Sequence, residues 1–184
     1  MRRSHLRILW LAFCLGLSEA AVALAEDWPQ FRGLGGLGIS RASALPTSWS
    51  DTENVVWKME ILGRGASSPV VYGNRVFLTY QTGYAVDARN PGDINDLKRH
   101  VLCVDAVTGK SLWKWRANTV LPEVDTRRFR SYASSTPAVD ADRVYCFFGK
   151  SGVVALEHTG NLLWQASVGE ETHGWGSAYS PVLY

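Results

Sequence analysis

The 184-residue chain carries 19 lysine and arginine residues against 17 aspartate and glutamate residues, which gives a formal net charge of +2. Three of these arginines and one of the glutamates lie in the first 25 residues, so the remainder holds sixteen residues of each sign. A balanced chain gives no electrostatic reason to expect binding to nucleic acid or to an anionic membrane.

The first 25 residues have the order of a secretory signal peptide. A basic region with Arg2, Arg3 and Arg7 comes first, an apolar run comes next at 8–17, and Ala23-Leu24-Ala25 is a small-x-small cleavage site. The apolar run is too short to cross a bilayer as a helix. We therefore expect export to the periplasm or the extracellular space, with no transmembrane span after cleavage.

Residues 26–53 are predicted to form an irregular lead-in, because they are rich in glycine, serine and tryptophan and show no period. Residues 33–38 formally match the G-x-G-x-x-G pattern of dinucleotide sites. That pattern requires a strand before it and a helix after it. Neither is expected here, since no strand pattern precedes the glycines and Pro46 interrupts the segment after them. We assign it no cofactor-binding role.

A first cycle of β-type runs comes after a predicted strand at 54–61. Its four runs lie at residues 67–72, 75–80, 101–105 and 111–116. The first two are joined by Gly73-Asn74, a two-residue hairpin signal. Residues 81–100 are polar and broken by glycine and proline, which predicts a loop insertion at the edge of a sheet.

A second cycle repeats the first after a connecting loop, whose basic cluster at 127–130 we interpret as solvated. Its four β-type runs lie at residues 134–139, 143–148, 152–157 and 161–166. A third cycle opens in residues 177–184. Repetition at a period of roughly 40–50 residues, without a helical period in the mature chain, predicts four-stranded blades of an all-β propeller.

Each complete cycle contains one copy of a turn motif. The copies read Cys103-x-Asp105-x-x-Thr108-Gly109-x-x-x-Trp113 and Ala155-x-Glu157-x-Thr159-Gly160-x-x-x-Trp164. The glycine supplies the positive φ of a tight turn. The carboxylate is placed to accept hydrogen bonds from the turn. The tryptophan is suited to packing on a neighbouring blade while its N–H bonds a backbone carbonyl, and Trp57 holds the equivalent place before the first cycle.

Residues that suggest chemistry are better explained by structure. We expect Cys103 and Cys146, which lie in apolar runs, to be buried in the core rather than joined in a disulfide. The histidines show no spacing typical of metal ligands. The serines before each proline mark the entrances of innermost strands, and the most site-like segment is His173-Gly-Trp-Gly176. We assign no catalytic, cofactor-binding or metal-binding residue.

The turn motif resembles the docking motif of pyrroloquinoline-quinone-type β-propeller repeats, Ala-x-Asp-x-x-Thr-Gly-x-x-x-Trp, and the resemblance covers residues 27–184. The first copy differs in having Cys103 in place of alanine. The second has Glu157 in place of aspartate and lacks one residue before Thr159. Three further segments are similar to exported bacterial members of the family: residues 27–33, 132–137 and 173–177.

The resemblance implies a ring of about seven or eight blades. The chain is then a partial β-propeller with two four-stranded blades, at about 67–116 and 134–167. A third blade begins near 179, and the N-terminal strand would complete the last blade. We expect residues 54–184 to be the N-terminal part of a longer protein.

The family includes quinone- and calcium-dependent dehydrogenases as well as non-catalytic relatives such as the propeller lipoprotein of the outer-membrane assembly machinery. The catalytic branch implies an aspartate base, calcium ligands and often a vicinal cysteine pair, and no residue here matches these. The sequence therefore favours an exported, non-enzymatic scaffold that binds protein partners and needs no cofactor. The alternative is the N-terminal part of a dehydrogenase that uses pyrroloquinoline quinone with calcium.

Overall fold

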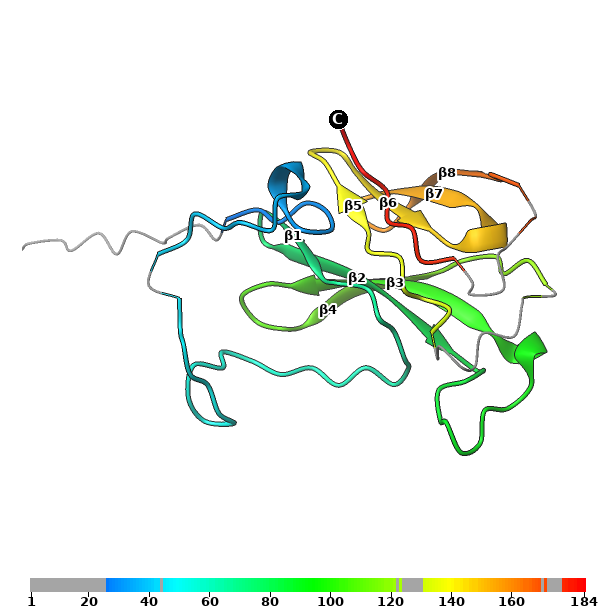
Figure 1. The fold of residues 1–184 in the computed structure, drawn as a ribbon, viewed down its shortest axis with the longest axis horizontal. Helices are drawn as coiled ribbons and strands as arrows, with labels where there is room; N and C mark the ends of the chain where they lie inside the picture. Colours follow the sequence, from blue (N-terminus) through cyan, green and yellow to red (C-terminus); the bar gives the residue numbers. More distant parts are fainter. Residues whose placement is uncertain (1–25, 44, 122, 124–130, 170, 172–176) are drawn as a thin grey trace, which may run out of the picture.

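The computed structural model describes residues 26–184 except 44, 122, 124–130, 170 and 172–176. Its regular structure consists of two four-stranded antiparallel sheets (Figure 1). The first sheet contains β1 (Val70–Tyr72), β2 (Arg75–Thr82), β3 (Lys98–Asp105) and β4 (Ser111–Arg116). The second contains β5 (Ala138–Val139), β6 (Arg143–Phe147), β7 (Val153–Glu157) and β8 (Leu162–Ala166). Three short 3-10 turns, η1 (Leu34–Gly36), η2 (Ile94–Asp96) and η3 (Gly149–Ser151), complete the assigned elements.

The order of strands in each sheet follows the order of the chain, so each sheet is a meander. No α-helix is assigned in the part of the chain that the structure describes. The prediction of an all-β fold built from four-stranded propeller blades is therefore confirmed. The Gly73-Asn74 hairpin is also present, with Gly73 at φ 55° between β1 and β2.

Both sheets carry a register shift at the same place in the turn motif. In the first sheet Cys103 pairs with Trp113, and the register shifts between Cys103 and Val104. In the second sheet Ala155 pairs with Trp164, and the shift comes between Ala155 and Leu156. A bulge re-aims the side chain beside it, and in both copies of the motif it lies next to the tryptophan pair.

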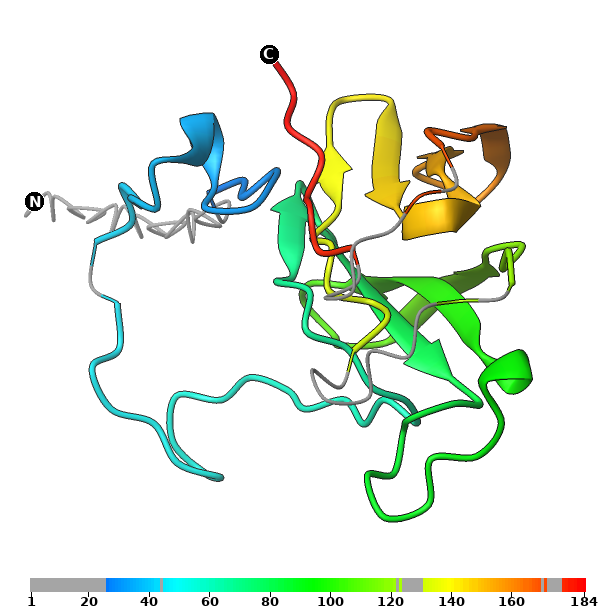
Figure 2. The same ribbon diagram turned by 45° about the vertical axis from the view of Figure 1, so that its right-hand side comes forward.

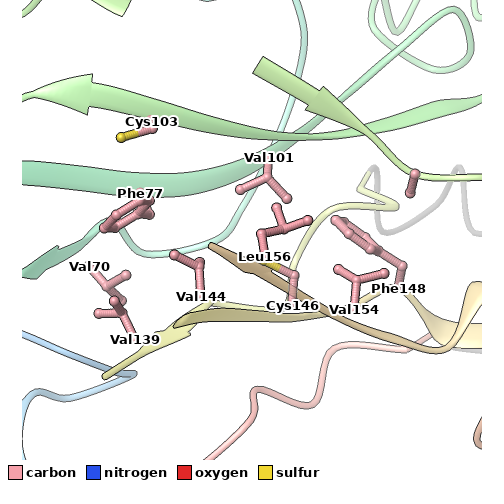
Figure 3. Packing of buried hydrophobic residues seen from close by; sticks show 11 residues of the cluster. Val70, Phe77, Val101, Cys103, Val139, Val144, Cys146, Phe148, Val154 and Leu156 are labelled. Carbon is pink, nitrogen blue, oxygen red and sulfur yellow. The ribbon is translucent and has the colours of Figure 1, made fainter. Parts of the chain in front are cut away.

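The two sheets pack face to face through a single apolar cluster (Figure 3). The first sheet contributes valine, phenylalanine and cysteine side chains, and the second sheet contributes valine, leucine and cysteine side chains. Its buried members include Val70, Phe77, Val101, Cys103, Val139, Val144, Cys146, Val154 and Leu156. Both cysteines are free and buried, as the sequence indicated.

The opposite face of the first sheet is covered by an extended segment instead of a paired strand. Trp57, Met59 and Ile61 pack against a cluster that includes Leu102 and Val104. The prediction of a strand over 54–61 is wrong, since the structure assigns no strand there. The alternation of half-buried and exposed side chains is present, but a strand also needs a hydrogen-bonded neighbour, and no described strand pairs with this segment.

The predicted loop at 81–100 is shorter in the structure. Strand β2 continues to Thr82 and β3 begins at Lys98, with Gln81 paired to Arg99. The hairpin of β2 and β3 is therefore longer than predicted, because polar residues at its end also pair as strands. The third cycle, which was expected to begin near 179, has no assigned strand in its described residues.

Candidate interaction surface

Trp57 fastens the lead-in to the first sheet. Its indole Nε1 donates to the carbonyl oxygen of Ala106 at 2.8 Å. Its ring lies over Gly109, where an added Cβ would come within 2.5 Å of ring atoms. Gly109 also has a φ of 70°, which favours glycine. The turn therefore excludes a side chain for two reasons, its conformation and the tryptophan above it.

Trp113 repeats this contact between the first and the second sheet. Its Nε1 donates to the carbonyl oxygen of His158 at 2.8 Å. An added Cβ on Gly160 would lie 2.8 Å from the nearest atom of the Trp113 ring, and Gly160 has a φ of 92°. The packing of the tryptophan on a neighbouring unit and its bond to a carbonyl oxygen agree with the prediction, and the structure adds that the contact is made on the Thr-Gly turn of the next unit.

The carboxylates of the turn motif are engaged in these turns. Asp105 accepts hydrogen bonds from the Thr108 hydroxyl at 2.8 Å and from its backbone N–H at 2.7 Å. Glu157 accepts from the Asn161 amide at 2.8 Å and from the Thr159 hydroxyl at 2.9 Å. These hydrogen bonds hold the pKa of both carboxyls below their ordinary values. Both groups are therefore ionised acceptors that stabilise the turn.

Trp164 is the third tryptophan of the series, and it lies on a more open surface. It is 42% exposed, and its ring stands 6.2 Å from that of Tyr145. Other exposed apolar side chains on β8 and just after it are Leu162, Leu163 and Val168. The outer part of the second sheet is thus the candidate surface for a further propeller unit or a protein partner.

The loop between β2 and β3 has a small core of its own. Buried Tyr84, Ala85 and Leu97 pack with Tyr132, which comes from the connection between the sheets. Gln81 fixes the start of the loop, because its buried amide donates to the carbonyl oxygen of Tyr84 at 3.0 Å. The loop is therefore an ordered feature that extends from the sheet (Figure 2).

A buried ion pair holds the connection between the two sheets against the first. The Arg99 guanidinium pairs with Glu123, and both side chains are more than nine-tenths buried. Arg99 also donates to the carbonyl oxygen of Tyr132 at 2.9 Å and to the hydroxyl of Ser151 at 3.3 Å. We did not predict this pair. The alternation along the strand does indicate that Arg99 is buried, since Arg99 lies two and four residues before the apolar Val101 and Cys103.

The serine-rich segments link successive units. Ser67 accepts from the N–H of Thr79 and donates to its carbonyl oxygen, both at 3.0 Å. The N–H of Ser68 donates to the Thr136 hydroxyl, and the N–H of Thr136 donates to the Ser180 hydroxyl, again at 3.0 Å. These hydroxyls therefore join the segment before one proline to neighbouring backbone and to the segment before the next proline.

Of the remaining sequence candidates, the structure describes only residues 33–38. Residues 33–38 contain the 3-10 turn η1 and no helix, so they lack the frame of a dinucleotide site. Segments 127–130 and 173–176 lie outside the described residues. Within the described part of the chain, no group of three histidine, cysteine, aspartate or glutamate side chains could hold a metal ion.

Comparison with known families shows what the chain is similar to. A family model for pyrroloquinoline-quinone-type repeats, described as outer membrane protein assembly factor BamB, matches residues 40–180. No curated protein matches the chain. In the described part of the chain, no helix is long and apolar enough to span a membrane.

Proposed function

The chain belongs to the repeat family described as outer membrane protein assembly factor BamB, and on that premise we propose that it is an exported, non-enzymatic scaffold that binds protein partners. The name of the family describes an assembly factor, which is a protein that acts through other proteins. The signal-like order of residues 1–25 supports export to the periplasm or the extracellular space.

The observation that carries the proposal is the ordered loop between β2 and β3. Its own core of Tyr84, Ala85, Leu97 and Tyr132 holds it before any partner arrives. Asp87, Arg89 and Asn95 are exposed on it and can make polar contacts. Binding residues are concentrated on loops that a rigid scaffold positions. A loop that is ordered in advance also loses less conformational entropy on binding.

The hydrogen bonds of the repeated carboxylates also support a non-enzymatic role. Asp105 and Glu157 accept hydrogen bonds from their own turns. A general base or a metal ligand needs free lone pairs directed at a substrate or an ion. We infer that in this scaffold the repeated residues join one blade to the next and that the loop between β2 and β3 supplies recognition.

A quinone and a calcium ion would be required for the alternative, a dehydrogenase. The described residues do not fit this pair of groups. They assemble no cluster of metal-binding side chains, and Cys103 and Cys146 are buried in different sheets rather than adjacent. We therefore derive no catalytic step through a quinone.

The experiment that separates these functions is quinone and calcium reconstitution. The purified protein is mixed with pyrroloquinoline quinone and calcium, passed through a desalting column, and assayed for dye reduction with a series of alcohols and sugars. A known quinoprotein dehydrogenase serves as the positive control. We expect no retained quinone absorbance and no dye reduction. Stoichiometric retention of quinone together with substrate-dependent dye reduction would overturn the proposal.

A further inference from the structure

The innermost strands of the two sheets meet at the axis side of the molecule. Strands β1 and β5 lie against each other there, and the lead-in passes beside both of them (Figure 2). In a propeller the innermost strands surround a central channel. Their inner edges have no further strand beside them in the described residues, so their free N–H groups would face that channel.

One N–H at an equivalent position in each unit donates to the lead-in instead of to a strand of its own sheet. Pro69, Pro137 and Pro181 open the three units, and Val71, Val139 and Leu183 each come two residues later. Counting from the proline therefore places these three N–H groups at the same position of each unit.

Three consecutive residues of the lead-in accept these three N–H groups. The N–H of Val71 donates to the carbonyl oxygen of Trp28 at 2.9 Å, and Val71 accepts in return from the N–H of Trp28 at 2.8 Å. The N–H of Val139 donates to the carbonyl oxygen of Pro29 at 2.8 Å. The N–H of Leu183 donates to the side-chain oxygen Oε1 of Gln30 at 3.1 Å.

Folding within the lead-in fixes this segment in place. Gly33 has a φ of 71° and donates its N–H to the carbonyl oxygen of Gln30 at 2.9 Å, so the chain turns back. An added Cβ on Gly33 would lie 2.7 Å from the Trp28 ring, which covers the turn. Asp27 anchors the other end by accepting the N–H of Gly73 at 2.7 Å. Gln30 itself is only 6% exposed.

We propose that residues 27–33 form an axial clasp, in which Trp28 and Pro29 hold the innermost strands β1 and β5 and Gln30 holds the segment at Leu183 that opens the third unit. The clasp covers the end of the innermost strands that leads into the turns after β1 and β5. A ligand or partner then approaches the axis from the opposite end, where the loop after β2 lies. The proposal does not depend on the function proposed above.

The residue types of the clasp agree with this role. Proline at position 29 has no N–H to leave unpaired, and its carbonyl oxygen is free to accept. Glutamine at position 30 reaches the third unit with a side chain, because the backbone there is already turning back to Gly33. The ring of Trp28 packs on the turn at Gly33, and its backbone N–H and carbonyl oxygen both form hydrogen bonds with Val71.

Amide hydrogen exchange of the whole chain tests the clasp. The Gln30→Met variant keeps the volume of the side chain and removes the acceptor oxygen. We expect exchange at Leu183 to accelerate about fivefold, the effect of one lost hydrogen bond, with the amides inside β3 and β7 unchanged. Phe31→Met is the matched control, since Phe31 is adjacent and 51% exposed. It is expected to leave Leu183 unaffected.

A second variant, Trp28→Ala, removes the plate and is expected to accelerate exchange at Val71, Val139 and Leu183 together. If amide exchange inside β3 and β7 accelerates equally, this variant unfolds as a whole. The comparison of Gln30→Met with Phe31→Met then decides whether the clasp exists. The clasp is refuted if these three amides exchange at unstructured rates in the unmodified chain. It is also refuted if Gln30→Met and Phe31→Met have the same effect on Leu183.

Discussion

Replacing Gly160 by alanine should destabilise the contact between the two sheets. Gly160 has a φ of 92°, and an added Cβ would lie 2.8 Å from the Trp113 ring. The ring is a bulky aromatic plate whose N–H is bonded to His158. It has to move before the methyl group can be accommodated, and the movement weakens that hydrogen bond.

The expected magnitude is the sum of two effects. A non-glycine residue in the left-handed region costs about 1–2 kcal/mol. Displacing Trp113 costs about 2 kcal/mol more, from the weakened hydrogen bond and lost packing. Gly73→Ala is the matched control, because Gly73 has a φ of 55° and no atom within 4 Å of its added Cβ. That variant should show the backbone cost alone.

The assay is urea unfolding of both variants, followed by far-ultraviolet circular dichroism. We expect the free energy of unfolding to fall by about 3 kcal/mol in Gly160→Ala and by about 1 kcal/mol in Gly73→Ala. If the two variants differ by less than about 0.5 kcal/mol, the ring of Trp113 does not enforce the glycine, and the reasoning fails.

Three further predictions concern buried and titratable groups. Glu123→Leu leaves the buried Arg99 guanidinium without its partner, so unfolding experiments should show a loss of about 3 kcal/mol, much of which the double variant with Arg99→Met restores. Burial raises the pKa of the Cys103 thiol to about 12 and raises the pKa of Cys146 as well. Peptide mass spectrometry should therefore find both unlabelled by maleimide in the folded protein and labelled after unfolding. Burial, with Arg116, Lys98 and Lys114 nearby, lowers the pKa of His100, and a nuclear magnetic resonance titration should place it below about 6.5.

The histidine prediction has a defined sign. A folded pKa below the unfolded one means that folding favours the neutral ring. The contribution of His100 to stability is complete above about pH 6.5 and is lost as the pH falls through the folded value. A measured pKa at or above the ordinary value contradicts this. Rapid labelling of Cys103 in the folded state, or an undiminished stability of Glu123→Leu, would contradict the other two.

The repeat could be recognised in the sequence because each unit forms the same turn with residues of the same types. Asp105, Thr108 and Gly109 form a local turn, and a local turn is specified by neighbours in sequence. Packing of Trp113 on the neighbouring unit was also predictable, since a large aromatic ring with one N–H recurs at a fixed place in the motif, but the spacing does not identify Gly160 as its contact. Burial of Cys103 and Cys146 could be inferred from the apolar runs around them.

Contacts between segments that lie far apart in the chain could not be predicted from the sequence. Residues 54–61 alternate like a strand, but pairing depends on a neighbour that the pattern does not specify. The Arg99–Glu123 pair joins a sheet to a connection, and polarity alone placed Arg99 in a loop. The lead-in showed no period because Trp28, Pro29 and Gln30 each contact a different unit. A segment that crosses the units has no reason to follow the period of any one of them.

The central claim is that the repeated tryptophan and glycine residues join one sheet to the next. A double-mutant cycle between Trp113→Leu and Gly160→Ala measures this most directly. If the ring is what excludes the methyl group, Gly160→Ala should cost only about 1 kcal/mol in the Trp113→Leu background, a coupling of about 2 kcal/mol. Costs that add to within about 0.5 kcal/mol would contradict the claim.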